Sequence, residues 1–68
     1  MENNLKALRE KFDFTQQDIA DYLGISKIAY HYKETCQREF KLSECKKISE
    51  LFNLGIDEIF FGQQVHFK

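Results

Sequence analysis

The chain has 68 residues, of which 43% are hydrophobic and 15% aromatic, and its net charge is −1. A chain of this length forms one domain, here residues 1–68, and buries only ~60% of the surface that it exposes when unfolded. No apolar run approaches the ~20 residues of a membrane span and no basic-then-apolar segment opens the chain, so we expect a cytoplasmic protein without membrane contacts.

The sequence predicts an all-α domain of five short helices. It has no proline and three glycines, and its apolar residues recur with the helical period. We expect helices over residues 4–12, 16–23, 27–34, 42–52 and 56–61, and a polar loop over residues 35–40. After Gly62, the alternation of apolar and polar residues in Val65-His66-Phe67 is compatible with a short C-terminal β-strand.

The same spacing predicts which side chains face inward. Asp13 is expected to end the first helix, because Asp tolerates a left-handed backbone better than most residues. Asp57 and Glu58 suit the positive N-terminal end of the last helix. The inward residues are Leu5, Leu8 and Phe12 in the first helix, Leu42, Cys45, Ile48, Leu51 and Phe52 in the fourth, and Ile59 and Phe60 in the last.

Residues 16–34 have the pattern of two helices joined by a tight turn. Thr15 and Ser26 can cap the two helices with their hydroxyl oxygens. Gly24 follows the first helix directly, where a left-handed residue is needed. The first helix has one apolar face, formed by Ile19, Ala20 and Leu23. This is the helix-turn-helix pattern, whose second helix enters the DNA major groove.

Charge is polarised along the chain. Residues 27–47 contain six basic and three acidic residues, whereas the rest contains four basic and eight acidic ones. Contact with phosphates needs a local basic face and not a basic protein. Scattered, solvated charges are the alternative interpretation.

Taken together, the sequence resembles the phage repressor and Cro-like helix-turn-helix family, often called the XRE family. The resemblance covers about residues 5–61. It implies a five-helix lambda-repressor-like DNA-binding domain. It is carried by Leu8-Arg9, Phe14-Thr15-Gln16, Ile19-Ala20, Leu23-Gly24-Ile25-Ser26, Glu34, Leu42 through Ile48 to Phe52, and Ile56-Asp57-Glu58-Ile59-Phe60.

Three positions depart from that pattern. Tyr30 stands where the family usually buries a β-branched residue, so we expect the helix contact there to accommodate a ring. Lys33 replaces an apolar or aromatic residue, with Tyr32 beside it to supply some of that packing. Cys36 replaces the glycine that usually follows the second helix of the motif.

The resemblance implies that residues 27–34 form the helix that reads DNA. Lys27, Ile28, His31 and Tyr32 would face the major groove, with Ala29 close to its floor. Lys27 suits guanine O6 or N7, and Ile28 suits a thymine methyl. Partial burial against residues 42–52 is the alternative for Ile28, and an ordinary exposed residue is the alternative for His31.

Further residues are expected to hold the DNA backbone or the domain itself. Gln16, followed by Gln17, opens the first helix of the motif, and the Gln16 side chain is placed to meet the DNA backbone there. The backbone amides at that N-terminus add a partial positive end for a phosphate. Thr35 and Arg38, and also Lys41, are phosphate candidates in the loop that follows. Arg9 and Glu34 resemble a structural ion pair of the family.

One DNA-binding domain of this size contacts few base edges, so a homodimer on a pseudo-palindromic operator is expected. Residues 60–68 are the predicted dimerisation tail, through Phe60, Phe61, Val65 and Phe67. The alternative is that these side chains close the core.

No enzymatic, metal or cofactor site is expected. The chain lacks a nucleophile with a paired base and a glycine-rich phosphate loop, and Cys36 and Cys45 lack metal-ligand spacing. The leading interpretation is a sequence-specific transcriptional regulator, like a phage or mobile-element Cro or repressor. A protein-interaction module that binds a larger repressor is the alternative.

Overall fold

The computed structural model describes residues 3–60, which form five helices. They are α1 (Leu5–Lys11), α2 (Gln16–Leu23), α3 (Lys27–Glu34), α4 (Leu42–Phe52) and α5 (Ile56–Ile59). The predicted all-α class and the bounds of the three middle helices are confirmed. The first helix is one residue shorter at each end than expected, and α5 ends at Ile59. The strand considered for residues 65–67 lies outside the described residues.

The capping residues anticipated from the sequence define the helix-turn-helix. Thr15 Oγ1 accepts from the Asp18 N–H at 3.0 Å, and Asp18 Oδ2 accepts from the Thr15 N–H at 2.8 Å, which is a reciprocal capping box. Ser26 Oγ accepts from the Ala29 N–H at 3.1 Å. Gly24 and Asp13 have φ of +76° and +61°, as predicted for residues that end helices.

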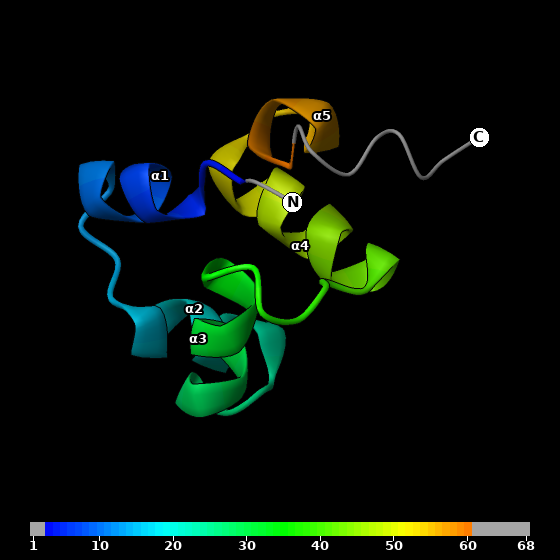
Figure 1. The fold of residues 1–68 in the computed structure, drawn as a ribbon. Helices are drawn as coiled ribbons and strands as arrows, with labels where there is room; N and C mark the ends of the chain where they lie inside the picture. The colour runs from blue at the N-terminus through cyan, green and yellow to red at the C-terminus, as the bar shows by residue number, and fades with distance from the viewer. Residues whose placement is uncertain (1–2, 61–68) are drawn as a thin grey trace.

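One hydrophobic core joins all five helices. The helices α2 and α3 pack together at one end, and α4 and α5 lie at the other (Figure 1). The Asn4 N–H donates to the Ile59 carbonyl at 2.8 Å and ties the start of α1 to α5. No helix among residues 3–60 has the length and apolar character needed to span a bilayer. The buried apolar residues are Leu5, Leu8, Ile19, Ala20, Leu23, Tyr30, Phe40, Cys45, Ile48, Phe52, Ile59 and Phe60.

Two expectations about burial are wrong. Phe12 is 49% exposed, because it follows the last residue of α1 and only one side of its ring meets Phe52, at a centroid distance of 5.4 Å. Leu42 is 54% exposed at the first position of α4, where the helix begins beyond the core. Phe60 faces inward as expected and is fully buried with its ring against Phe40, which favours the alternative that it closes the core over the dimer contact that was also assigned to it. Phe61, Val65 and Phe67 lie outside the described residues.

The loop after α3 keeps the backbone that a glycine would adopt, although its residue is a cysteine. Cys36 has a φ of +68°, in the left-handed region, and its N–H donates to the Lys33 carbonyl. An L-residue with a Cβ pays about 1 kcal/mol or more for this conformation. The loop therefore stores backbone strain at Cys36.

We expect Cys36→Gly to raise the free energy of unfolding by about 1 kcal/mol, because glycine adopts a positive φ without a steric cost. Cys36→Ala is the matched control, since it also removes the thiol that accepts weakly from Asn3 but keeps the Cβ. Urea denaturation followed by circular dichroism measures both. Equal stability of the two variants would contradict the strain.

Candidate nucleic-acid interface

Five of the predicted DNA-facing residues line one open recess between the start of α2 and the length of α3. They are Gln16, Lys27, Ile28, His31 and Tyr32, and the recess has a volume of ≈ 420 Å³. The sequence prediction thus selected residues that come together on one surface. No acidic side chain lines this recess.

Ile28 is the apolar residue most clearly presented to solvent. The residue is 68% exposed, which favours the DNA-facing interpretation over the alternative of partial burial against α4. The inward face of α3 is occupied by Tyr30 and Glu34, which leaves Ile28 on the outer face of the helix. Ala29 is half-buried beside it, with its N–H held by the cap of α3.

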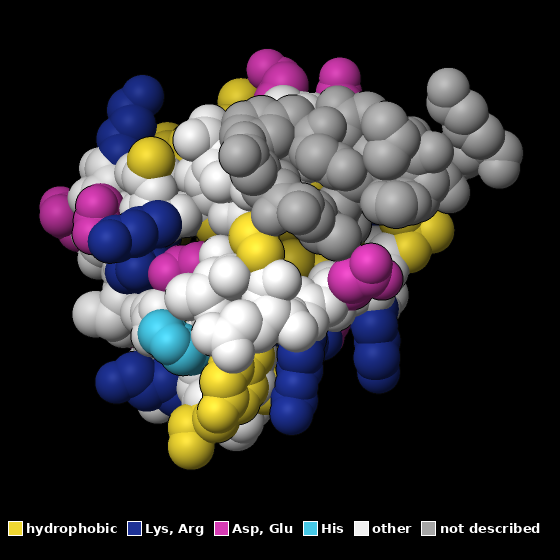
Figure 2. Space-filling view, viewed as in Figure 1, with side chains coloured by type: hydrophobic (Ala, Val, Ile, Leu, Met, Phe, Trp, Pro, Cys, Tyr) yellow, Lys and Arg dark blue, Asp and Glu magenta, His cyan; other side chains and the backbone are white. Residues whose placement is uncertain are grey.

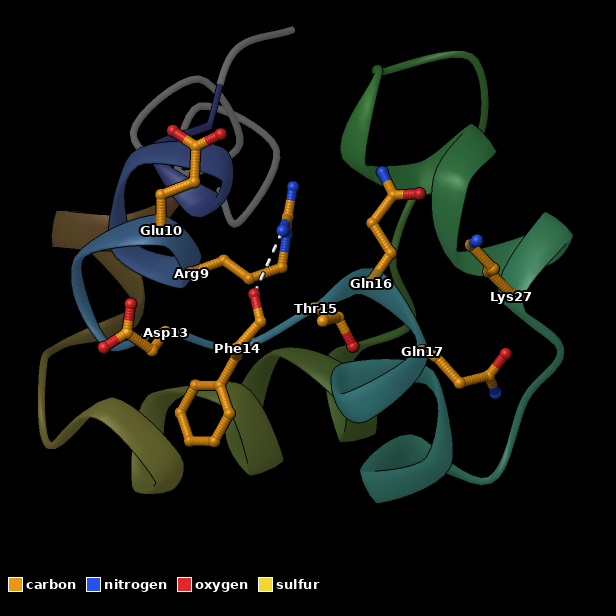
Figure 3. Close-up of a pocket in the computed structure, with 8 residues that line it drawn as sticks. All are labelled: Arg9, Glu10, Asp13, Phe14, Thr15, Gln16, Gln17 and Lys27. Carbon is orange, nitrogen blue, oxygen red and sulfur yellow. Dashed lines mark hydrogen bonds between the residues drawn. The ribbon is translucent and has the colours of Figure 1, made fainter.

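Behind this surface, the buried carboxylate of Glu34 joins three helices. It accepts from Arg9 Nε at 2.8 Å and Arg9 Nη2 at 3.1 Å, from Tyr30 Oη at 2.8 Å, and from Gln16 Nε2 at 2.9 Å. Arg9 Nη1 also donates to the Phe14 carbonyl at 3.0 Å (Figure 3). The predicted ion pair between Arg9 and Glu34 is therefore present, and it is part of a larger network.

The network shifts the pKa values of Glu34, Tyr30 and Arg9, each in a direction that its contacts explain. Burial alone would raise the pKa of Glu34, but the hydrogen bonds from Arg9, Gln16 and Tyr30 outweigh it and hold that pKa below its ordinary value. Burial, with the carboxylate beside it, raises the pKa of the Tyr30 hydroxyl. The hydrogen bond from Arg9 to Glu34 raises the guanidinium pKa of Arg9. Glu34 is thus ionised and Tyr30 is a neutral donor.

Gln16 reaches from α2 to both faces of α3. Besides Glu34, its Nε2 lies 3.2 Å from His31 Nδ1. Gln17, the next residue, points away from Gln16 (Figure 3). Its side-chain amide donates to Asp21 Oδ1 at 2.8 Å. At this N-terminus the Asp18 N–H is taken by Thr15, while those of Gln16 and Gln17 precede the first helical hydrogen bond.

Tyr32 connects the recess to the loop after α3. Its carbonyl accepts from the N–H groups of Gln37 and Arg38 at 2.8 and 3.1 Å. The guanidinium of Arg38 lies 5.0 Å from the centroid of the Tyr32 ring, which is a cation–π distance. Thr35 donates its hydroxyl and its N–H to the His31 carbonyl, so both donors of this predicted phosphate contact are engaged by α3.

Of the six basic residues in 27–47, Lys33 forms a buried salt bridge with an acidic residue and the other five are exposed. Lys33 Nζ lies 2.6 Å from Glu44 Oε1, so Lys33 joins α3 to α4 and adds no free charge. Figure 2 shows basic, hydrophobic and histidine side chains together at the end of the molecule where α2 and α3 lie, and acidic ones at the opposite end and the sides. The basic residues without a salt bridge among residues 3–60 are Lys27, Arg38, Lys41, Lys46 and Lys47.

Sequence reasoning did not anticipate the roles of Tyr30 and Gln16 as donors to Glu34. The signal available was indirect: a tyrosine at a buried position needs a partner for its hydroxyl, and Glu34 follows one turn later on the same face. Among residues 3–60 no cluster suits a metal ion. Burial raises the pKa of the Cys45 thiol to about 11, while Cys36 is exposed.

We expect the Glu34 network to make stability depend on acid pH. A carboxylate whose pKa is lowered by folding stabilises the fold above its unfolded pKa, about 4.3, and this contribution disappears as the pH falls through the lower folded value. Glu34→Gln should cost about 3 kcal/mol at neutral pH, because it leaves Arg9 without a counter-charge, and should reduce the acid dependence.

Urea denaturation across a pH series measures this effect, with Glu39→Gln on the exposed loop as the control. An acid profile in Glu34→Gln as steep as that of the natural chain would contradict the assignment. Glu44, whose pKa also lies below its ordinary value despite burial, accounts for acid dependence that persists in the variant.

Comparison with known proteins agrees with this geometry. The helix-turn-helix family model matches residues 5–59. The chain is also 35% identical over 60 residues to the uncharacterized HTH-type transcriptional regulator YqaE of Bacillus subtilis (strain 168). That match covers 88% of the chain and 52% of YqaE, so the chain spans about half the length of this relative. The chain therefore belongs to the Cro/C1-type (XRE) helix-turn-helix family of non-enzymatic DNA-binding domains.

Proposed function

We propose that the protein is a sequence-specific transcriptional regulator that places α3 in the major groove of its operator. The observation that carries this proposal is the recess in which Lys27, Ile28 and His31 meet the start of α2 without an acidic neighbour. A basic, an apolar and an imidazole side chain on the exposed side of one helix suit the mixed chemistry of base edges.

Each side chain has a distinct role in this proposal. Lys27 donates to O6 or N7 of guanine, and Ile28 packs against the methyl group of a thymine. His31 and Tyr32 donate to a base acceptor or to a phosphate. Ala29 is small enough to let the start of α3 approach the floor of the groove.

Phosphate contacts hold the helix in register from both ends of the recess. At one end, the free amides of Gln16 and Gln17 meet a phosphate at the N-terminus of α2. At the other, Arg38 meets a phosphate on the far side of Tyr32. These contacts set affinity and orientation and carry no base sequence.

We further propose a homodimer on a pseudo-palindromic operator, with half-sites about one helical turn apart. Support comes from the small number of base edges within reach of α3. Phe61, Val65 and Phe67 are the proposed contact of the tail, without Phe60. The resemblance to phage repressors and Cro proteins extends the proposal to a repressor of the phage or mobile-element kind. The name of YqaE, an HTH-type transcriptional regulator, supports a role in the regulation of transcription.

Selection from a random DNA library tests this function. We expect enrichment of a two-fold symmetric site, and Lys27→Ala should weaken binding to that site by roughly tenfold, because it removes a base contact. Ile28→Ala should lower the preference for thymine at one position per half-site. Lys6→Ala, which removes an exposed lysine of α1, is the control and should bind normally.

Two results of this selection would contradict the proposal. Failure to enrich any sequence at physiological salt would favour the interaction module that binds a larger repressor. Unchanged operator binding by both Lys27→Ala and Tyr32→Ala would show that α3 does not read the DNA.

The stacking of Arg38 on Tyr32 predicts a separate effect on salt dependence. Arg38→Ala should reduce the slope of log K against log salt by about 1, because one phosphate contact is lost. Tyr32→Phe keeps the ring face and should keep the slope, whereas Tyr32→Leu should lower it toward that of Arg38→Ala. Fluorescence anisotropy across a salt series measures the slopes, with Lys6→Ala as the control. Identical slopes for Arg38→Ala and the natural chain would contradict a phosphate contact.

A further inference from the structure

We infer that Gln16 is a positioning residue that fixes His31 as a one-sided hydrogen-bond donor, with Nδ1 held inside the protein and Nε2–H presented to the DNA. This inference rests on the proposed function for its consequence at the operator, but its structural part concerns the free protein. It is carried by a chain of hydrogen bonds whose direction is set at Glu34.

The first step is the orientation of the Gln16 amide. A side-chain amide has an NH₂ donor end and a carbonyl acceptor end. The end that lies 2.9 Å from Glu34 Oε1 must be the NH₂, because an ionised carboxylate only accepts. Glu34 is kept ionised by Arg9, whose Nε and Nη2 both donate to it.

The second step is the tautomer of His31. The Gln16 NH₂ that serves Glu34 also lies 3.2 Å from His31 Nδ1, and its second N–H can bond only to a ring nitrogen that carries a lone pair. In the neutral ring, Nδ1 is therefore the acceptor and the proton is on Nε2. The exposed ring thus presents its Nε2–H to solvent.

The third step is the consequence for DNA. A fixed N–H donor can bond to guanine O6 or N7, to adenine N7, or to thymine O4, but it cannot accept from the N4 amino group of cytosine. His31 would therefore discriminate against cytosine at the base position that its Nε2–H contacts. Both N–H groups of the Gln16 side chain are used within the free protein.

The neighbouring Gln17 provides a matched control. It has the same side chain on the same turn of α2, but its side-chain amide donates to Asp21 and not to α3. Only the backbone N–H of Gln17, which a substitution of the side chain leaves in place, belongs to the proposed phosphate contact. Gln16→Met and Gln17→Met remove the same amide at similar volume. Only the first of the two should alter the ring of His31.

The first measurement uses the full chain without DNA. Nitrogen-15 correlation spectra of the neutral His31 ring should show the Nε2–H tautomer, with a Nδ1 resonance that moves in Gln16→Met and stays in place in Gln17→Met. A Nδ1–H tautomer in the natural chain would overturn the inference. So would a Nδ1 resonance that is indifferent to Gln16→Met in a variant whose folding is verified by its amide spectrum.

The second measurement uses the selected operator with each base in turn at the His31 position. Discrimination against cytosine should fall at least roughly fivefold in Gln16→Met, since a free ring can also accept, and should persist in Gln17→Met. Retained discrimination in Gln16→Met would overturn the role of Gln16 in specificity. If no operator exists, the proposed function fails while the ring spectra still decide the tautomer.

Discussion

The ionised carboxylate of Glu34 is the group on which the rest of the structure depends. Removing a carboxylate from water costs several kcal/mol, and this cost is repaid only when its lone pairs are well satisfied. Glu34 meets that condition with four hydrogen bonds from α1, α2 and α3. Because its donors come from three short helices, their relative placement is restricted to arrangements in which all the donors reach one carboxylate.

This restriction links the interior of α3 to its outer surface. Tyr30 and Glu34 lie one turn apart and anchor the inward face, while Ile28 and His31 lie on the outer side of the same helix. A helix held by a hydrogen-bonded network has a defined rotation about its axis as well as a defined position. The directions of the exposed side chains therefore depend on the buried ones. A substitution at Glu34 would shift the side chains that line the recess, although Glu34 does not line it.

The sequence predicted the local features of this fold better than its long-range contacts. The ends of α2 and α3 follow from Thr15, Gly24 and Ser26, whose effects act within one turn of the backbone. Periodicity assigns a face to each helix, but it does not say how far the core extends along it. For that reason it failed for Phe12 and Leu42, which lie at the ends of their helices.

The polar contacts of the site depend on distances between helices, which a sequence pattern does not contain. The pair of Arg9 and Glu34 was anticipated through a family resemblance, whereas the bonds from Tyr30 and Gln16 were not. Lys33 illustrates the same point, because its salt bridge with Glu44 joins two different helices and arises only from the fold.

Results

Sequence analysis

The chain has 68 residues, of which 43% are hydrophobic and 15% aromatic, and its net charge is −1. A chain of this length forms one domain, here residues 1–68, and buries only ~60% of the surface that it exposes when unfolded. No apolar run approaches the ~20 residues of a membrane span and no basic-then-apolar segment opens the chain, so we expect a cytoplasmic protein without membrane contacts.

The sequence predicts an all-α domain of five short helices. It has no proline and three glycines, and its apolar residues recur with the helical period. We expect helices over residues 4–12, 16–23, 27–34, 42–52 and 56–61, and a polar loop over residues 35–40. After Gly62, the alternation of apolar and polar residues in Val65-His66-Phe67 is compatible with a short C-terminal β-strand.

The same spacing predicts which side chains face inward. Asp13 is expected to end the first helix, because Asp tolerates a left-handed backbone better than most residues. Asp57 and Glu58 suit the positive N-terminal end of the last helix. The inward residues are Leu5, Leu8 and Phe12 in the first helix, Leu42, Cys45, Ile48, Leu51 and Phe52 in the fourth, and Ile59 and Phe60 in the last.

Residues 16–34 have the pattern of two helices joined by a tight turn. Thr15 and Ser26 can cap the two helices with their hydroxyl oxygens. Gly24 follows the first helix directly, where a left-handed residue is needed. The apolar face of that helix consists of Ile19, Ala20 and Leu23. This is the helix-turn-helix pattern, whose second helix enters the DNA major groove.

Charge is polarised along the chain. Residues 27–47 contain six basic and three acidic residues, whereas the rest contains four basic and eight acidic ones. Contact with phosphates needs a local basic face and not a basic protein. Scattered, solvated charges are the alternative interpretation.

Taken together, the sequence resembles the phage repressor and Cro-like helix-turn-helix family, often called the XRE family. The resemblance covers about residues 5–61. It implies a five-helix lambda-repressor-like DNA-binding domain. It is carried by Leu8-Arg9, Phe14-Thr15-Gln16, Ile19-Ala20, Leu23-Gly24-Ile25-Ser26, Glu34, Leu42 through Ile48 to Phe52, and Ile56-Asp57-Glu58-Ile59-Phe60.

Three positions depart from that pattern. Tyr30 stands where the family usually buries a β-branched residue, so we expect the helix contact there to accommodate a ring. Lys33 replaces an apolar or aromatic residue, with Tyr32 beside it to supply some of that packing. Cys36 replaces the glycine that usually follows the second helix of the motif.

The resemblance implies that residues 27–34 form the helix that reads DNA. Lys27, Ile28, His31 and Tyr32 would face the major groove, with Ala29 close to its floor. Lys27 suits guanine O6 or N7, and Ile28 suits a thymine methyl. Partial burial against residues 42–52 is the alternative for Ile28, and an ordinary exposed residue is the alternative for His31.

Further residues are expected to hold the DNA backbone or the domain itself. Gln16, followed by Gln17, opens the first helix of the motif, and the Gln16 side chain is placed to meet the DNA backbone there. The backbone amides at that N-terminus add a partial positive end for a phosphate. In the loop after residue 34, the phosphate candidates are Thr35, Arg38 and Lys41. Arg9 and Glu34 resemble a structural ion pair of the family.

One DNA-binding domain of this size contacts few base edges, so a homodimer on a pseudo-palindromic operator is expected. Residues 60–68 are the predicted dimerisation tail, through Phe60, Phe61, Val65 and Phe67. The alternative is that these side chains close the core.

No enzymatic, metal or cofactor site is expected. The chain lacks a nucleophile with a paired base and a glycine-rich phosphate loop, and Cys36 and Cys45 lack metal-ligand spacing. The leading interpretation is a sequence-specific transcriptional regulator, like a phage or mobile-element Cro or repressor. A protein-interaction module that binds a larger repressor is the alternative.

Overall fold

The computed structural model describes residues 3–60, which form five helices. They are α1 (Leu5–Lys11), α2 (Gln16–Leu23), α3 (Lys27–Glu34), α4 (Leu42–Phe52) and α5 (Ile56–Ile59). The predicted all-α class and the bounds of the three middle helices are confirmed. The first helix is one residue shorter at each end than expected, and α5 ends at Ile59. The strand considered for residues 65–67 lies outside the described residues.

The capping residues anticipated from the sequence define the helix-turn-helix. Thr15 Oγ1 accepts from the Asp18 N–H at 3.0 Å, and Asp18 Oδ2 accepts from the Thr15 N–H at 2.8 Å, which is a reciprocal capping box. Ser26 Oγ accepts from the Ala29 N–H at 3.1 Å. Gly24 and Asp13 have φ of +76° and +61°, as predicted for residues that end helices.

One hydrophobic core joins the helices. The helices α2 and α3 pack together at one end of the molecule, and α4 and α5 lie at the other (Figure 1). The Asn4 N–H donates to the Ile59 carbonyl at 2.8 Å and ties the start of α1 to α5. No helix among residues 3–60 has the length and apolar character needed to span a bilayer. The buried apolar residues are Leu5, Leu8, Ile19, Ala20, Leu23, Tyr30, Phe40, Cys45, Ile48, Phe52, Ile59 and Phe60.

Two expectations about burial are wrong. Phe12 is 49% exposed, because it follows the last residue of α1 and packs its ring only partly, against Phe52 at a centroid distance of 5.4 Å. Leu42 is 54% exposed at the first position of α4, where the helix begins at the edge of the core. Phe60 faces inward as expected and is fully buried with its ring against Phe40, which favours the alternative that it closes the core over the dimer contact that was also assigned to it. The rest of the predicted interface, Phe61, Val65 and Phe67, lies outside the described residues.

The loop after α3 has a left-handed backbone at Cys36. Cys36 has a φ of +68°, and its N–H donates to the Lys33 carbonyl at 3.2 Å. An L-residue with a Cβ pays about 1 kcal/mol or more for this conformation. The loop therefore stores backbone strain at Cys36.

We expect Cys36→Gly to raise the free energy of unfolding by about 1 kcal/mol, because glycine adopts a positive φ without a steric cost. Cys36→Ala is the matched control, since it also removes the thiol that accepts weakly from Asn3 but keeps the Cβ. Urea denaturation followed by circular dichroism measures both variants. Equal stability of the two would contradict the strain.

Candidate nucleic-acid interface

Five of the predicted DNA-facing residues line one open recess between the start of α2 and the outer side of α3. They are Gln16, Lys27, Ile28, His31 and Tyr32, and the recess has a volume of ≈ 420 Å³. The sequence prediction thus selected residues that come together on one surface. None of the side chains that line the recess is acidic.

Ile28 is the most exposed large apolar residue of residues 3–60. The residue is 68% exposed, which favours the DNA-facing interpretation over the alternative of partial burial against α4. The buried residues of α3 are Tyr30 and Glu34, which leaves Ile28 on the outer face of the helix. Ala29 is half-buried beside it, with its N–H held by the cap of α3.

Behind this surface, the buried carboxylate of Glu34 joins three helices. It accepts from Arg9 Nε at 2.8 Å and Arg9 Nη2 at 3.1 Å, from Tyr30 Oη at 2.8 Å, and from Gln16 Nε2 at 2.9 Å. Arg9 Nη1 also donates to the Phe14 carbonyl at 3.0 Å (Figure 3). The predicted ion pair between Arg9 and Glu34 is therefore present, and it is part of a larger network.

The network shifts the pKa values of Glu34, Tyr30 and Arg9, each in a direction that its contacts explain. Burial alone would raise the pKa of Glu34, but the hydrogen bonds from Arg9, Gln16 and Tyr30 outweigh it and hold that pKa below its ordinary value. Burial, with the carboxylate beside it, raises the pKa of the Tyr30 hydroxyl. The hydrogen bond to Glu34 raises the pKa of Arg9. Glu34 is thus ionised and Tyr30 is a neutral donor.

Gln16 reaches from α2 to α3. Besides Glu34, its Nε2 lies 3.2 Å from His31 Nδ1. Gln17, the next residue, points away from Gln16 (Figure 3). Its side-chain amide donates to Asp21 Oδ1 at 2.8 Å. The amides of Gln16 and Gln17 precede the first helical hydrogen bond of α2, which the Ile19 N–H makes to the Thr15 carbonyl.

Tyr32 connects the recess to the loop after α3. Its carbonyl accepts from the N–H groups of Gln37 and Arg38 at 2.8 and 3.1 Å. The guanidinium of Arg38 lies 5.0 Å from the centroid of the Tyr32 ring, which is a cation–π distance. Thr35 donates both its hydroxyl and its N–H to the His31 carbonyl, so the two donors of this predicted phosphate contact are engaged by α3.

Of the six basic residues in 27–47, Lys33 forms a buried salt bridge with an acidic residue and the other five are exposed. Lys33 Nζ lies 2.6 Å from Glu44 Oε1, so Lys33 joins α3 to α4 and adds no free charge. Figure 2 shows basic, hydrophobic and histidine side chains together at the end of the molecule where α2 and α3 lie, with acidic ones at the opposite end and the sides. The basic residues of this segment without a salt bridge to residues 3–60 are Lys27, Arg38, Lys41, Lys46 and Lys47.

Sequence reasoning did not anticipate Tyr30 and Gln16 as donors to Glu34. The signal available was indirect: a buried tyrosine needs a partner for its hydroxyl, and Glu34 follows one turn later on the same face. No cluster within residues 3–60 suits a metal ion. Burial raises the pKa of the Cys45 thiol to about 11, while Cys36 is exposed.

We expect the Glu34 network to make stability depend on acid pH. A carboxylate whose pKa is lowered by folding stabilises the fold above its unfolded pKa, about 4.3, and this contribution disappears as the pH falls through the lower folded value. Glu34→Gln should cost about 3 kcal/mol at neutral pH, because it leaves Arg9 without a counter-charge, and should reduce the acid dependence.

Urea denaturation across a pH series measures this effect, with Glu39→Gln on the exposed loop as the control. An acid profile in Glu34→Gln as steep as that of the natural chain would contradict the assignment. Some acid dependence should persist through Glu44, because hydrogen bonds from Lys33 and Lys41 outweigh its burial and also lower its pKa.

Comparison with known proteins agrees with this geometry. The helix-turn-helix family model matches residues 5–59. The chain is also 35% identical over 60 residues to the uncharacterized HTH-type transcriptional regulator YqaE of Bacillus subtilis (strain 168). That match covers 88% of the chain and 52% of YqaE, so the chain spans about half the length of this relative. The chain therefore belongs to the Cro/C1-type (XRE) helix-turn-helix family of non-enzymatic DNA-binding domains.

Proposed function

We propose that the protein is a sequence-specific transcriptional regulator that places α3 in the major groove of its operator. The observation that carries this proposal is the recess in which Lys27, Ile28 and His31 meet the start of α2, lined by no acidic side chain. A basic, an apolar and an imidazole side chain on the exposed side of one helix suit the mixed chemistry of base edges.

Each side chain has a distinct role in this proposal. Lys27 donates to O6 or N7 of guanine, and Ile28 packs against the methyl group of a thymine. His31 and Tyr32 donate to a base acceptor or to a phosphate. Ala29 is small enough to let the start of α3 approach the floor of the groove.

Phosphate contacts hold the helix in register from both ends of the recess. At one end, the free amides of Gln16 and Gln17 meet a phosphate at the N-terminus of α2. At the other, Arg38 meets a phosphate beyond Tyr32. These contacts set affinity and orientation and carry no base sequence.

We further propose a homodimer on a pseudo-palindromic operator, with half-sites about one helical turn apart. Support comes from the small number of base edges within reach of α3. Phe61, Val65 and Phe67 are the proposed contact of the tail, without Phe60. The resemblance to phage repressors and Cro proteins extends the proposal to a repressor of the phage or mobile-element kind. The name of YqaE, an HTH-type transcriptional regulator, supports a role in the regulation of transcription.

Selection from a random DNA library tests this function. We expect enrichment of a two-fold symmetric site, and Lys27→Ala should weaken binding to that site by roughly tenfold, because it removes a base contact. Ile28→Ala should lower the preference for thymine at one position per half-site. Lys6→Ala, which removes an exposed lysine of α1, is the control and should bind normally.

Two results of this selection would contradict the proposal. Failure to enrich any sequence at physiological salt would favour the interaction module that binds a larger repressor. Unchanged operator binding by both Lys27→Ala and Tyr32→Ala would show that α3 does not read the DNA.

The stacking of Arg38 on Tyr32 predicts a separate effect on salt dependence. Arg38→Ala should reduce the slope of log K against log salt by about 1, because one phosphate contact is lost. Tyr32→Phe keeps the ring face and should keep the slope, whereas Tyr32→Leu should lower it toward that of Arg38→Ala. Fluorescence anisotropy across a salt series measures the slopes, with Lys6→Ala as the control. Identical slopes for Arg38→Ala and the natural chain would rule out this phosphate contact.

A further inference from the structure

We infer that Gln16 is a positioning residue that fixes His31 as a one-sided hydrogen-bond donor, with Nδ1 held by the protein and Nε2–H presented to the DNA. This inference rests on the proposed function for its consequence at the operator, but its structural part concerns the free protein. It is carried by a chain of hydrogen bonds whose direction is set at Glu34.

The first step is the orientation of the Gln16 amide. A side-chain amide has an NH₂ donor end and a carbonyl acceptor end. The end that lies 2.9 Å from Glu34 Oε1 must be the NH₂, because an ionised carboxylate only accepts. Glu34 is kept ionised by Arg9, whose Nε and Nη2 both donate to it.

The second step is the tautomer of His31. The Gln16 NH₂ that serves Glu34 also lies 3.2 Å from His31 Nδ1, and its second N–H can bond only to a ring nitrogen that carries a lone pair. In the neutral ring, Nδ1 is therefore the acceptor and the proton is on Nε2. The exposed ring thus has its Nε2–H free to donate.

The third step is the consequence for DNA. A fixed N–H donor can bond to guanine O6 or N7, to adenine N7, or to thymine O4, but it cannot accept from the N4 amino group of cytosine. His31 would therefore discriminate against cytosine at the base position that its Nε2–H contacts. Both N–H groups of the Gln16 side chain are used within the free protein.

The neighbouring Gln17 provides a matched control. It has the same side chain in the same turn of α2, but its side-chain amide donates to Asp21 and not to α3. Only the backbone N–H of Gln17, which a substitution of the side chain leaves in place, belongs to the proposed phosphate contact. Gln16→Met and Gln17→Met remove the same amide at similar volume. Only the first of the two should alter the ring of His31.

The first measurement uses the full chain without DNA. Nitrogen-15 correlation spectra of the neutral His31 ring should show the Nε2–H tautomer, with a Nδ1 resonance that moves in Gln16→Met and stays in place in Gln17→Met. A Nδ1–H tautomer in the natural chain would overturn the inference. So would a Nδ1 resonance that is indifferent to Gln16→Met in a variant whose folding is verified by its amide spectrum.

The second measurement uses the selected operator with each base in turn at the His31 position. Discrimination against cytosine should fall at least roughly fivefold in Gln16→Met, since a released ring can also accept, and should persist in Gln17→Met. Retained discrimination in Gln16→Met would overturn the role of Gln16 in specificity. If no operator is found, the proposed function fails while the ring spectra still decide the tautomer.

Discussion

The ionised carboxylate of Glu34 is the group on which the rest of the structure depends. Removing a carboxylate from water costs several kcal/mol, and this cost is repaid only when its lone pairs are well satisfied. Glu34 meets that condition with four hydrogen bonds from α1, α2 and α3. Because the donors come from three short helices, the relative placement of these helices is restricted to arrangements in which every donor reaches one carboxylate.

This restriction links the interior of α3 to its outer surface. Tyr30 and Glu34 lie one turn apart and anchor the inward face, while Ile28 and His31 lie on the exposed side of the same helix. A helix held by a hydrogen-bonded network has a defined rotation about its axis as well as a defined position. The directions of the exposed side chains therefore depend on the buried ones. A substitution at Glu34 would shift the side chains that line the recess, although Glu34 does not line it.

The sequence predicted local features of this fold better than its contacts between helices. The ends of α2 and α3 follow from Thr15, Gly24 and Ser26, whose effects act within one turn of the backbone. Periodicity assigns a face to each helix, but it does not say how far the core extends along that face, so it failed at the helix ends for Phe12 and Leu42. Arg9 was predicted as a partner of Glu34 through the family resemblance, but Gln16 was not, because its reach to Glu34 depends on the distance between α2 and α3.

Because the net charge of the chain is small, the side-chain contacts that are already formed in the free protein become important. A chain with a net charge of −1 gains little from long-range attraction to DNA, so the sequence discrimination that we propose depends on short-range contacts. Such contacts are costly when a flexible side chain must be ordered on binding, at about 0.5–1.5 kcal/mol for each. His31 is already held by Gln16, and Arg38 already lies over Tyr32, so part of that cost is met when the chain folds. Preorganised side chains can thus supply specificity where the overall charge cannot supply affinity.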